Sequence, residues 1–337
     1  MGIIGLNTIN LDGGNIIKKC GGSTPTPDTP SKPKWTGHAD AEGLKSIGWT
    51  DEDIAYYQEN GVNWNEEDDE YHKVNEENKA LYGVLTASNI SSYKTIIVYL
   101  PKIDTSGVTN ANNMFSDCAR LMAIPMLDTS NVTQMARMFQ ECYSLTSIPP
   151  LDTSSVTNMD NMFFDCRSLM SVPMLNTSNV TDMGGMFNNC YSLSSIPILD
   201  TSHVTDMSYM FQNCYSIKSI HMLNTNKAKS MVSIFVNCSS LTAISHLDVN
   251  MVTSSIKNIF SSCYSLTYVN IKNVKASCEL SYAGLLTKDS LLYLINNEAA
   301  TSAITITLAS YAYNKWANDP DIVAALANHP NISLASV

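Results

Sequence analysis

One pattern of 24 residues recurs along the middle of this chain. The sequence DTSNVTQMARMFQECYSLTSIPPL at residues 128–151 is matched position for position by residues 152–175 and again by residues 176–199. A period of this length is the signature of a solenoid, in which each coil buries its apolar face only against neighbouring coils. The repeat therefore predicts an α+β solenoid of about seven coils over residues 92–275.

The apolar positions of the repeat predict its core. From Met135 to Cys142 they have the i, i+3, i+4, i+7 spacing of a short amphipathic helix, with Thr133 as its N-cap. One Phe and one Cys per coil are expected to stack as buried columns, and the thiols are expected to be reduced. A disulfide between neighbouring coils is geometrically conceivable. The central members of the two columns are Phe139, Cys142, Phe163, Cys166, Phe187 and Cys190.

The segments before the repeats predict an anchor and a spacer. Residues 1–20 have the pattern of a short hairpin, expected to dock on another protein. The alternative is a disordered terminus or a strand folded back on its own chain. Residues 21–34 form a Pro/Ser/Thr linker that favours an extended spacer. The apolar residues of the anchor are Ile3, Ile4, Leu6, Ile9, Leu11 and Ile16.

Residues 35–91 and 276–337 predict two further units. The first is a small acidic helical module, with helices near residues 50–60 and 66–82. The second is a C-terminal α/β cap, in which LTKDSLLYLINN has Thr287 as an N-cap and AITITLA alternates like a strand. The final ANDPDIVAALANHPNISLASV is expected to form a helix and then a strand.

Charge and hydropathy exclude two classes of partner. Between residues 36 and 83 there are thirteen acidic residues and three lysines, which accounts for nearly all of the net charge of −11. The rest of the chain has no basic stripe that could replace the counterions of a phosphate backbone, so nucleic acid is not an expected partner. No segment is apolar enough for membrane insertion. The start lacks the pattern of a secretory signal, so we expect synthesis and assembly in a reducing cytoplasm.

The sequence contains no recognisable catalytic or metal-binding motif, so we expect neither enzymatic activity nor a cofactor. The Asp or Asn that opens each coil, such as Asp128, suits an Asx turn and is expected to be structural. The nearest candidate for a metal site is the pair His221 and His246 in adjacent coils. A glycan depolymerase is a remote alternative, because it would need a pair of carboxylates in a groove.

The residue after each repeat cysteine is the candidate binding position. It lies one residue from a buried position and is expected to point outward, where tyrosine suits sugar or protein recognition. Simple edge packing is the alternative interpretation. The candidates are Tyr143, Arg167, Tyr191, Tyr215 and Tyr264, and the rival candidates from the variable positions are Arg137, Gln140, Asn161, Tyr209 and Gln212.

The repeat D-T-S-N-V-T-x-M-x-x-M-F-x-x-C-x-S-L-x-S-I-P resembles the BspA-like leucine-rich repeat of bacterial surface proteins and phage virion proteins. The resemblance implies a right-handed solenoid with one sheet face, used for binding or adhesion. Three segments look like those attached to such repeats in tail or fibre proteins of gut bacteriophages, including crAss-like phages of Bacteroidales: GLNTINLDGGNIIKK, the acidic module, and the ending LTKDSLLYLINN…AITITL.

These resemblances predict a phage structural protein in the virion. Its N-terminus would contact other virion proteins, and its solenoid would meet a host-surface glycan or protein. The chain could also assemble as a homotrimer. The alternative is a bacterial adhesin on the cell surface.

Overall fold

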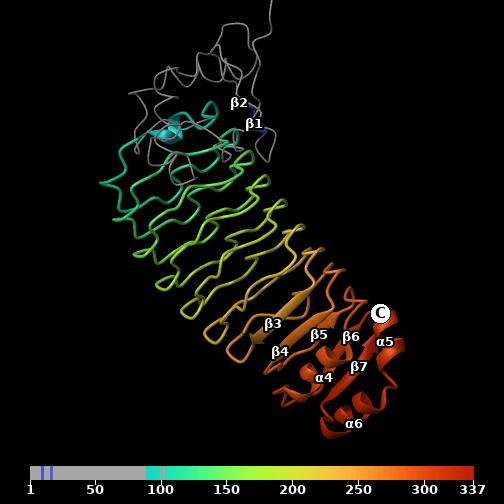
Figure 1. Cartoon of the computed structure of the whole chain (residues 1–337). Coiled ribbons are helices and arrows are strands. Elements are labelled where there is room, and N and C mark those ends of the chain that lie inside the picture. Colours follow the sequence, from blue (N-terminus) through green and yellow to red (C-terminus); the bar gives the residue numbers. More distant parts are fainter. Residues whose placement is uncertain (1–8, 11–15, 18–88, 99, 101–102) are drawn as a thin grey trace, which may run out of the picture.

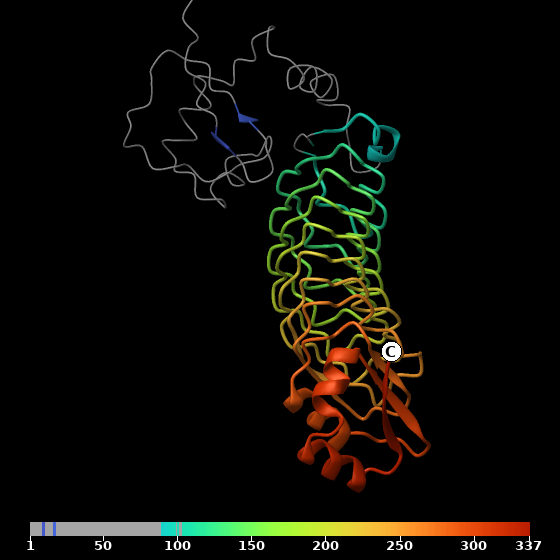
Figure 2. The same ribbon diagram turned by 90° about the vertical axis from the view of Figure 1, so that its right-hand side faces the viewer.

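Similar coils stack along one axis through most of the chain. The computed structural model describes residues 9–10, 16–17, 89–98, 100 and 103–337. Figure 1 shows the coils from the cyan to the orange part of the chain, with the helices and longer strands gathered at the C-terminal end. Figure 2, turned by 90°, shows the coils superposed along the same axis. The chain thus forms the solenoid that the repeat period predicts.

Stacked phenylalanine rings form the centre of the core. Neighbouring rings are parallel to within 3–14°, and their centroids lie 5.3–6.0 Å apart. Burial of each ring stabilises the fold by roughly 1.5 to 3 kcal/mol, but only when a coil lies on both sides of it. The column consists of Phe115, Phe139, Phe163, Phe187, Phe211, Phe235 and Phe260.

The repeat cysteines form a second buried column beside the rings. Each thiol from Cys142 to Cys263 donates a hydrogen bond to the carbonyl oxygen of the Phe one coil earlier, at 3.0–3.2 Å. All eight cysteines of the described residues are free and buried, Cys166 and Cys190 among them. Burial raises the pKa of the Cys118 thiol to about 12, since the charged thiolate would lose its hydration.

The predicted amphipathic helix from Met135 to Cys142 is wrong. This segment is a run of turns, in which Met138 N–H donates to the Met135 carbonyl at 3.2 Å and Cys142 N–H donates to Phe139 at 3.2 Å. The amides between them donate instead to the next coil, as Phe139 N–H does to the Met162 carbonyl at 2.9 Å. Apolar spacing alone could not separate a helix from this turn ribbon, because both bury the same side chains.

Left-handed residues at two positions of each coil prevent the helix. Arg137 and Glu141 have φ of 58° and 60°, and the equivalent residues have similar values in the other coils, except that the last coil has only Ser262. These positions are rich in Asn, Asp and Gly, the residues that tolerate this conformation best. The enrichment was the sequence signal for the turns, since a helix has no left-handed interior residue.

A continuous sheet face is also missing from most of the solenoid. Between residues 103 and 242, the described chain has only isolated parallel bridges, such as Gln134↔Asn158. A proline occupies the middle of the extended segment in four coils (Pro125, Pro149, Pro173 and Pro197) and cannot donate to a ladder. Strands β3 (Ala243–Asp248) and β4 (Tyr268–Lys272) pair in parallel where the proline is replaced.

The C-terminal unit is a three-stranded parallel sheet with helices. Its strands are β5 (Cys278–Leu280), β6 (Ile304–Leu308) and β7 (Ile332–Ser336), in the order β5-β6-β7. Its helices are α4 (Lys288–Asn296), α5 (Ser310–Trp316) and α6 (Pro320–Asn328).

Local signals define the ends of these helices. The predicted N-cap Thr287 accepts a hydrogen bond from Ser290 N–H at the start of α4, and Asp319 caps α6 in the same way. Helix α5 had no clear signal, because Ala309 precedes it without a side-chain cap. The core of this unit is continuous with that of the coils.

Only a few of the predicted N-terminal features lie within the described residues. Strands β1 (Ile9–Asn10) and β2 (Ile16–Ile17) pair antiparallel, with Ile9 opposite Ile17, as expected for a hairpin. A 3-10 turn, η1 (Ile90–Ser92), precedes the first coil. The linker 21–34, the two helices of the acidic module and the anchor residues Ile3, Ile4, Leu6 and Leu11 lie outside the described residues.

The left-handed positions give a stability prediction. Gly185 has φ of +60°, and a Cβ there would lie 2.2 Å from Asn161 Oδ1. We expect Gly185→Ala to lower the free energy of unfolding by about 1 to 2 kcal/mol. Gly107→Ala is the control, because no atom lies within 4 Å of its added Cβ. Equal urea midpoints for the two variants would contradict the strain.

Thiol burial gives a second prediction. Iodoacetamide at pH 8 should leave Cys118, Cys190 and Cys278 unmodified in the native chain and modify them in urea, as read by peptide mass spectrometry. Burial raises the folded-state pKa of Cys118 and Cys278 from 9.0 to about 12. The contribution of these neutral thiols to stability is therefore complete below about pH 8 and is lost as the pH rises from 9 toward 12. Alkylation of native Cys190 would contradict the buried column.

Candidate functional site

Four of the five predicted binding residues form one stacked row, which we call the tyrosine stripe: Tyr143, Arg167, Tyr191 and Tyr215. The Arg167 guanidinium carbon lies 4.5 Å from the Tyr143 ring centroid and 5.7 Å from that of Tyr191. The Tyr191 and Tyr215 centroids lie 5.1 Å apart, with a tilt of 31°. Cation–π contacts and ring stacking therefore join side chains that are 24 residues apart in the sequence.

The backbone holds the stripe in register. The serines after three of the four stripe positions donate hydrogen bonds to the preceding coil. Ser144 Oγ donates to the Ala119 carbonyl at 2.9 Å, Ser216 Oγ to Tyr191 at 2.7 Å, and Ser192 N–H to Arg167 at 3.2 Å. Each side chain is thus placed above its equivalent in the next coil. The fixed S of the repeat has this role.

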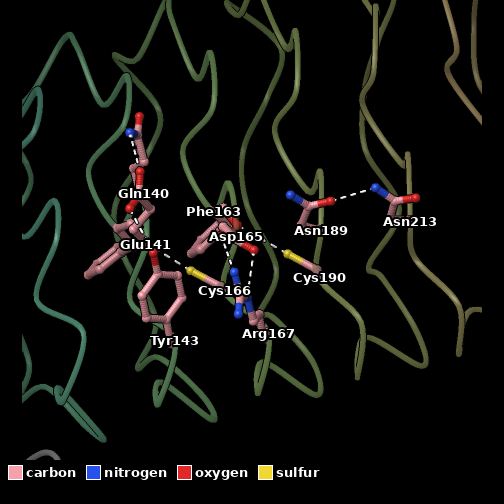
Figure 3. A network of polar contacts seen from close by, with 11 residues as sticks. Gln140, Glu141, Tyr143, Phe163, Asp165, Cys166, Arg167, Asn189, Cys190 and Asn213 are labelled. Carbon is pink, nitrogen blue, oxygen red and sulfur yellow. Dashed lines mark hydrogen bonds and ion pairs between the residues drawn. The ribbon is translucent and has the colours of Figure 1, made fainter.

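A row of acids and amides runs beside the stripe, which we call the polar ladder. It occupies the second left-handed position of each coil and contains Asp117, Glu141, Asp165, Asn189, Asn213 and Asn237. Asn213 Nδ2 donates to Asn189 Oδ1 at 2.6 Å, and Asn237 donates to Asn213 at the same distance. Figure 3 shows part of the ladder, from Glu141 to Asn213, with Tyr143 and Arg167 of the stripe beside it.

Two of the three acids of the ladder are held by residues of the stripe. Arg167 forms a bidentate ion pair with Asp165, with two N–H···O distances of 2.9 Å, and the Asp165 side chain is only 9% exposed (Figure 3). Tyr143 Oη donates to Glu141 at 2.7 Å. This hydrogen bond raises the pKa of Tyr143 to about 12, so its hydroxyl stays protonated at neutral pH.

The first acid of the ladder is held differently. Lys94 Nζ lies 2.8 Å from Asp117, which raises the pKa of Lys94. Both side chains are more than 40% exposed, so the pair contributes little to stability.

The stripe offers edges and hydroxyls to a partner more than open ring faces. Its faces are occupied by the next member of the row, whereas Arg167 and Tyr215 are exposed and Tyr143 and Tyr191 are half-buried. The charge of Arg167 is balanced by Asp165. The surface is therefore elongated, aromatic and nearly neutral, which suits a glycan or protein face held by hydrogen bonds and apolar contact.

Tyr264 does not join the stripe. Ser239 occupies the coil between it and Tyr215, and the Tyr264 ring instead meets Tyr282 edge-on with centroids 5.7 Å apart. The rival candidates are mostly involved in local contacts. Gln140 donates to Glu141, Asn161 donates to Asp160, and Arg137 lies 3.5 Å from Asp160. Tyr209 is 43% exposed, and Gln212 is half-buried.

The Asp and Asn residues that open the coils are used as turns. Asp128 Oδ1 accepts hydrogen bonds from Ser130 N–H and Oγ at 3.1 and 2.6 Å, and Asp152 has the same pair of bonds. These bonds lower the pKa of both carboxyl groups. Within the described part of the chain, no group of three His, Cys, Asp or Glu is arranged to hold a metal ion, and no helix is long and apolar enough to span a membrane.

Sequence reasoning missed a row of exposed apolar side chains, which we call the apolar ridge: Met174, Ile198 and Met222. Each precedes a buried leucine of the core and is 62–68% exposed. The signal was present, since two residues separate the buried Val or Ile from the buried Leu of each extended segment, and the second of the two is Met or Ile in three successive coils. Three such side chains in successive coils form a contiguous apolar patch.

The comparisons with known proteins place the repeats in a family. The family described as "Mycoplasma protein of unknown function, DUF285" matches residues 87–195 and 170–274, more than half of the chain. The chain belongs to the DUF285 family. Membership in DUF285 fits the BspA-like leucine-rich repeat that the sequence resembles. No curated protein matches the chain.

One solved structure with some similarity to this DUF285 chain is a crystal structure of a TLR13–ssRNA13 complex. The identity is 11%, and the match covers 75% of this chain and 45% of that one, with a TM-score of 0.23. The chain thus spans less than half the length of that structure. A TM-score of this size carries no information on fold or ligand, so the solenoid rests on the stacked columns described above.

The bidentate pair gives a test of the site's construction. Arg167→Ala should cost about 1 to 3 kcal/mol of unfolding free energy, because it leaves the Asp165 carboxylate without its partner. Adding Asp165→Asn should recover most of the loss, since Asn is native at the next positions of the ladder. Lys94→Ala is the control, with a cost of at most about 1 kcal/mol. A double variant as unstable as Arg167→Ala would contradict this arrangement.

Proposed function

We propose that this chain is a non-enzymatic recognition protein of a bacteriophage virion, whose solenoid binds a host-surface glycan or protein through the tyrosine stripe. The observation that carries the proposal is the contiguous row from Tyr143 to Tyr215. The four coils that hold this row do not need it to complete their buried core. The row lies outside the buried columns, so its aromatic side chains are not needed to fill the interior.

The shape of the stripe favours a large, repetitive or flat partner. Each member lies one coil from the next, so several equivalent contacts can form along one line. Weak contacts that act together give a gain in affinity without a deep pocket. The near-neutral charge of the stripe favours partners recognised by hydrogen bonds and apolar area over strongly charged ones.

The two ends of the chain have different proposed roles. We assign the C-terminal unit after residue 276 the role of a cap, which covers the apolar end of about seven coils. Support comes from the shared core, in which Val269 and Leu294 are both buried, and from Val269 N–H, which donates to Ser290 Oγ at the start of α4. Residues 1–20 would attach the chain to other virion proteins.

A first experiment locates the protein. Peptides of the chain should be abundant in mass spectra of purified phage particles, compared with the envelope fraction of the host. Signal confined to the bacterial envelope would replace the virion role with that of a cell-surface adhesin. If a chain that lacks residues 1–20 is still incorporated into particles at full occupancy, these residues are not the anchor.

A second experiment tests the binding face. The labelled full chain should bind cells of at least one Bacteroidales strain, and replacing Tyr143, Tyr191 and Tyr215 by Ser should lower the affinity at least about tenfold, as expected for aromatic anchors. Tyr264→Ser is the matched control, since Tyr264 is exposed but outside the stripe. Unchanged binding of the triple variant, with its fold verified by urea denaturation, would refute the stripe as the site.

A further inference from the structure

A cleft of about 290 Å³ lies where the last coils meet the C-terminal unit. Five successive layers of the chain contribute to it, from the coil of Asp200 to Tyr293 on α4. In Figure 1 this junction is the orange region where β3, β4 and α4 lie together. None of the tyrosine-stripe residues lines it. Its main lining residues are Asp200, Met222, Asn224, His246, Lys272 and Tyr293.

The backbone is irregular at this cleft. His246 has φ of 63°, whereas its equivalents Ile198 and Met222 are not left-handed. Strand β3 has an extra residue opposite β4 here, with the register shift between Ile244 and Leu247. Bulges commonly re-aim a side chain next to a binding site, and strain of this kind concentrates at such sites.

The charged groups of the cleft favour a ligand without negative charge. Hydrogen bonds from Ser202 hold the pKa of Asp200 below its usual range, so this carboxylate is ionised at neutral pH. Asp248 is paired with Lys272 at 3.1 Å and accepts a hydrogen bond from Asn273 at 2.7 Å. Two carboxylates against one lysine leave an excess of negative charge, which repels an anion.

The remaining lining residues combine apolar and hydrogen-bonding groups. Met222 is 63% exposed and continues the apolar ridge into the cleft, and Tyr293 is half-buried on its other side. Asn224 and His246 add donors and acceptors. An uncharged ligand with an apolar face and a rim of hydroxyls matches this lining, and a pyranose ring has both.

We propose that this cleft binds one neutral pyranose unit of a glycan. Its volume lies just below the usual range for ligand pockets, about 300 to 1,000 Å³, which suits a single sugar better than a large cofactor. Asp200 and His246 would accept or donate hydrogen bonds to ring hydroxyls, and Met222 and Tyr293 would cover the apolar face. The proposal concerns a second site and does not depend on the tyrosine stripe.

Saturation-transfer NMR of the full chain tests the proposal. The probes are the methyl glycosides of glucose, galactose, mannose and N-acetylglucosamine, with methyl glucuronide as an anionic comparison. At least one neutral glycoside should receive saturation at its ring protons, and the glucuronide should bind more weakly. No transfer to any of the four neutral glycosides would overturn the proposal.

Two substitutions that the fold tolerates locate the binding. Asp200→Asn keeps the turn, because Asn176 makes the same bond to Ser178 N–H in its own coil, and His246→Gly suits the left-handed backbone. Each should weaken the glycoside at least about tenfold, the effect of losing one hydrogen bond to a charged or oriented group.

Asp128→Asn is the matched control for the carboxylate, at the same position three coils away, and should leave binding unchanged. Replacing the stripe tyrosines by Ser should also leave it unchanged, which separates this site from the proposed host-binding face. Equal losses in Asp200→Asn and Asp128→Asn, or no loss in either cleft variant, would overturn the assignment.

Discussion

Half of the turn-ribbon amides of each coil find their acceptors only in the next coil, and this constraint shapes the rest of the molecule. The amides of Met135, Arg137, Phe139 and Glu141 all donate to residues 23 positions later in the chain. A single coil would leave these groups to water, and its Phe and Cys side chains would be exposed. Backbone hydrogen bonding and apolar burial therefore require the same stacking, and neither can form without the other.

The strict register also determines what the surface can be. Because equivalent residues lie above one another, any exposed position becomes a row along the solenoid axis. The tyrosine stripe, the polar ladder and the apolar ridge are three such rows. Substituting the exposed residue at one position of every coil would therefore change a whole face and leave the core unchanged. Such an architecture suits the recognition of varied surfaces. The terminal cleft arises where the register breaks at His246 and the C-terminal unit begins.

The sequence predicted the buried Phe and Cys columns correctly, but it did not predict the backbone conformation of the segments that carry them. The period located the buried Phe and Cys positions, and Asp128 identified the Asx turns, because these features depend on residue type and spacing alone. The helix from Met135 to Cys142 was wrong, since its spacing fits a helix and a turn ribbon equally. The Asn and Asp content of the left-handed positions, as at Asn161 and Asp165, was the signal that separates the two.

The candidate site was predictable only in part. The outward direction of the stripe followed from its place beside the cysteine, but the stacking of Arg167 between Tyr143 and Tyr191 depends on side-chain geometry that no sequence pattern reports. The cleft could not be found at all, because it joins Asp200 and Tyr293 across five layers of the chain. The separation of Tyr264 from the row was visible in the sequence, because Ser239 occupies the coil between Tyr215 and Tyr264.

Hydroxyl-radical footprinting of the full chain, with and without intact host cells, tests the central claim most directly. Oxidation of Tyr143, Tyr191 and Tyr215 should fall on binding, while exposed Tyr264 and Tyr311 should be oxidised as in the free chain. Protection of Tyr264 or Tyr311 with the stripe unprotected would contradict the account, since the solenoid would then meet its partner through another face.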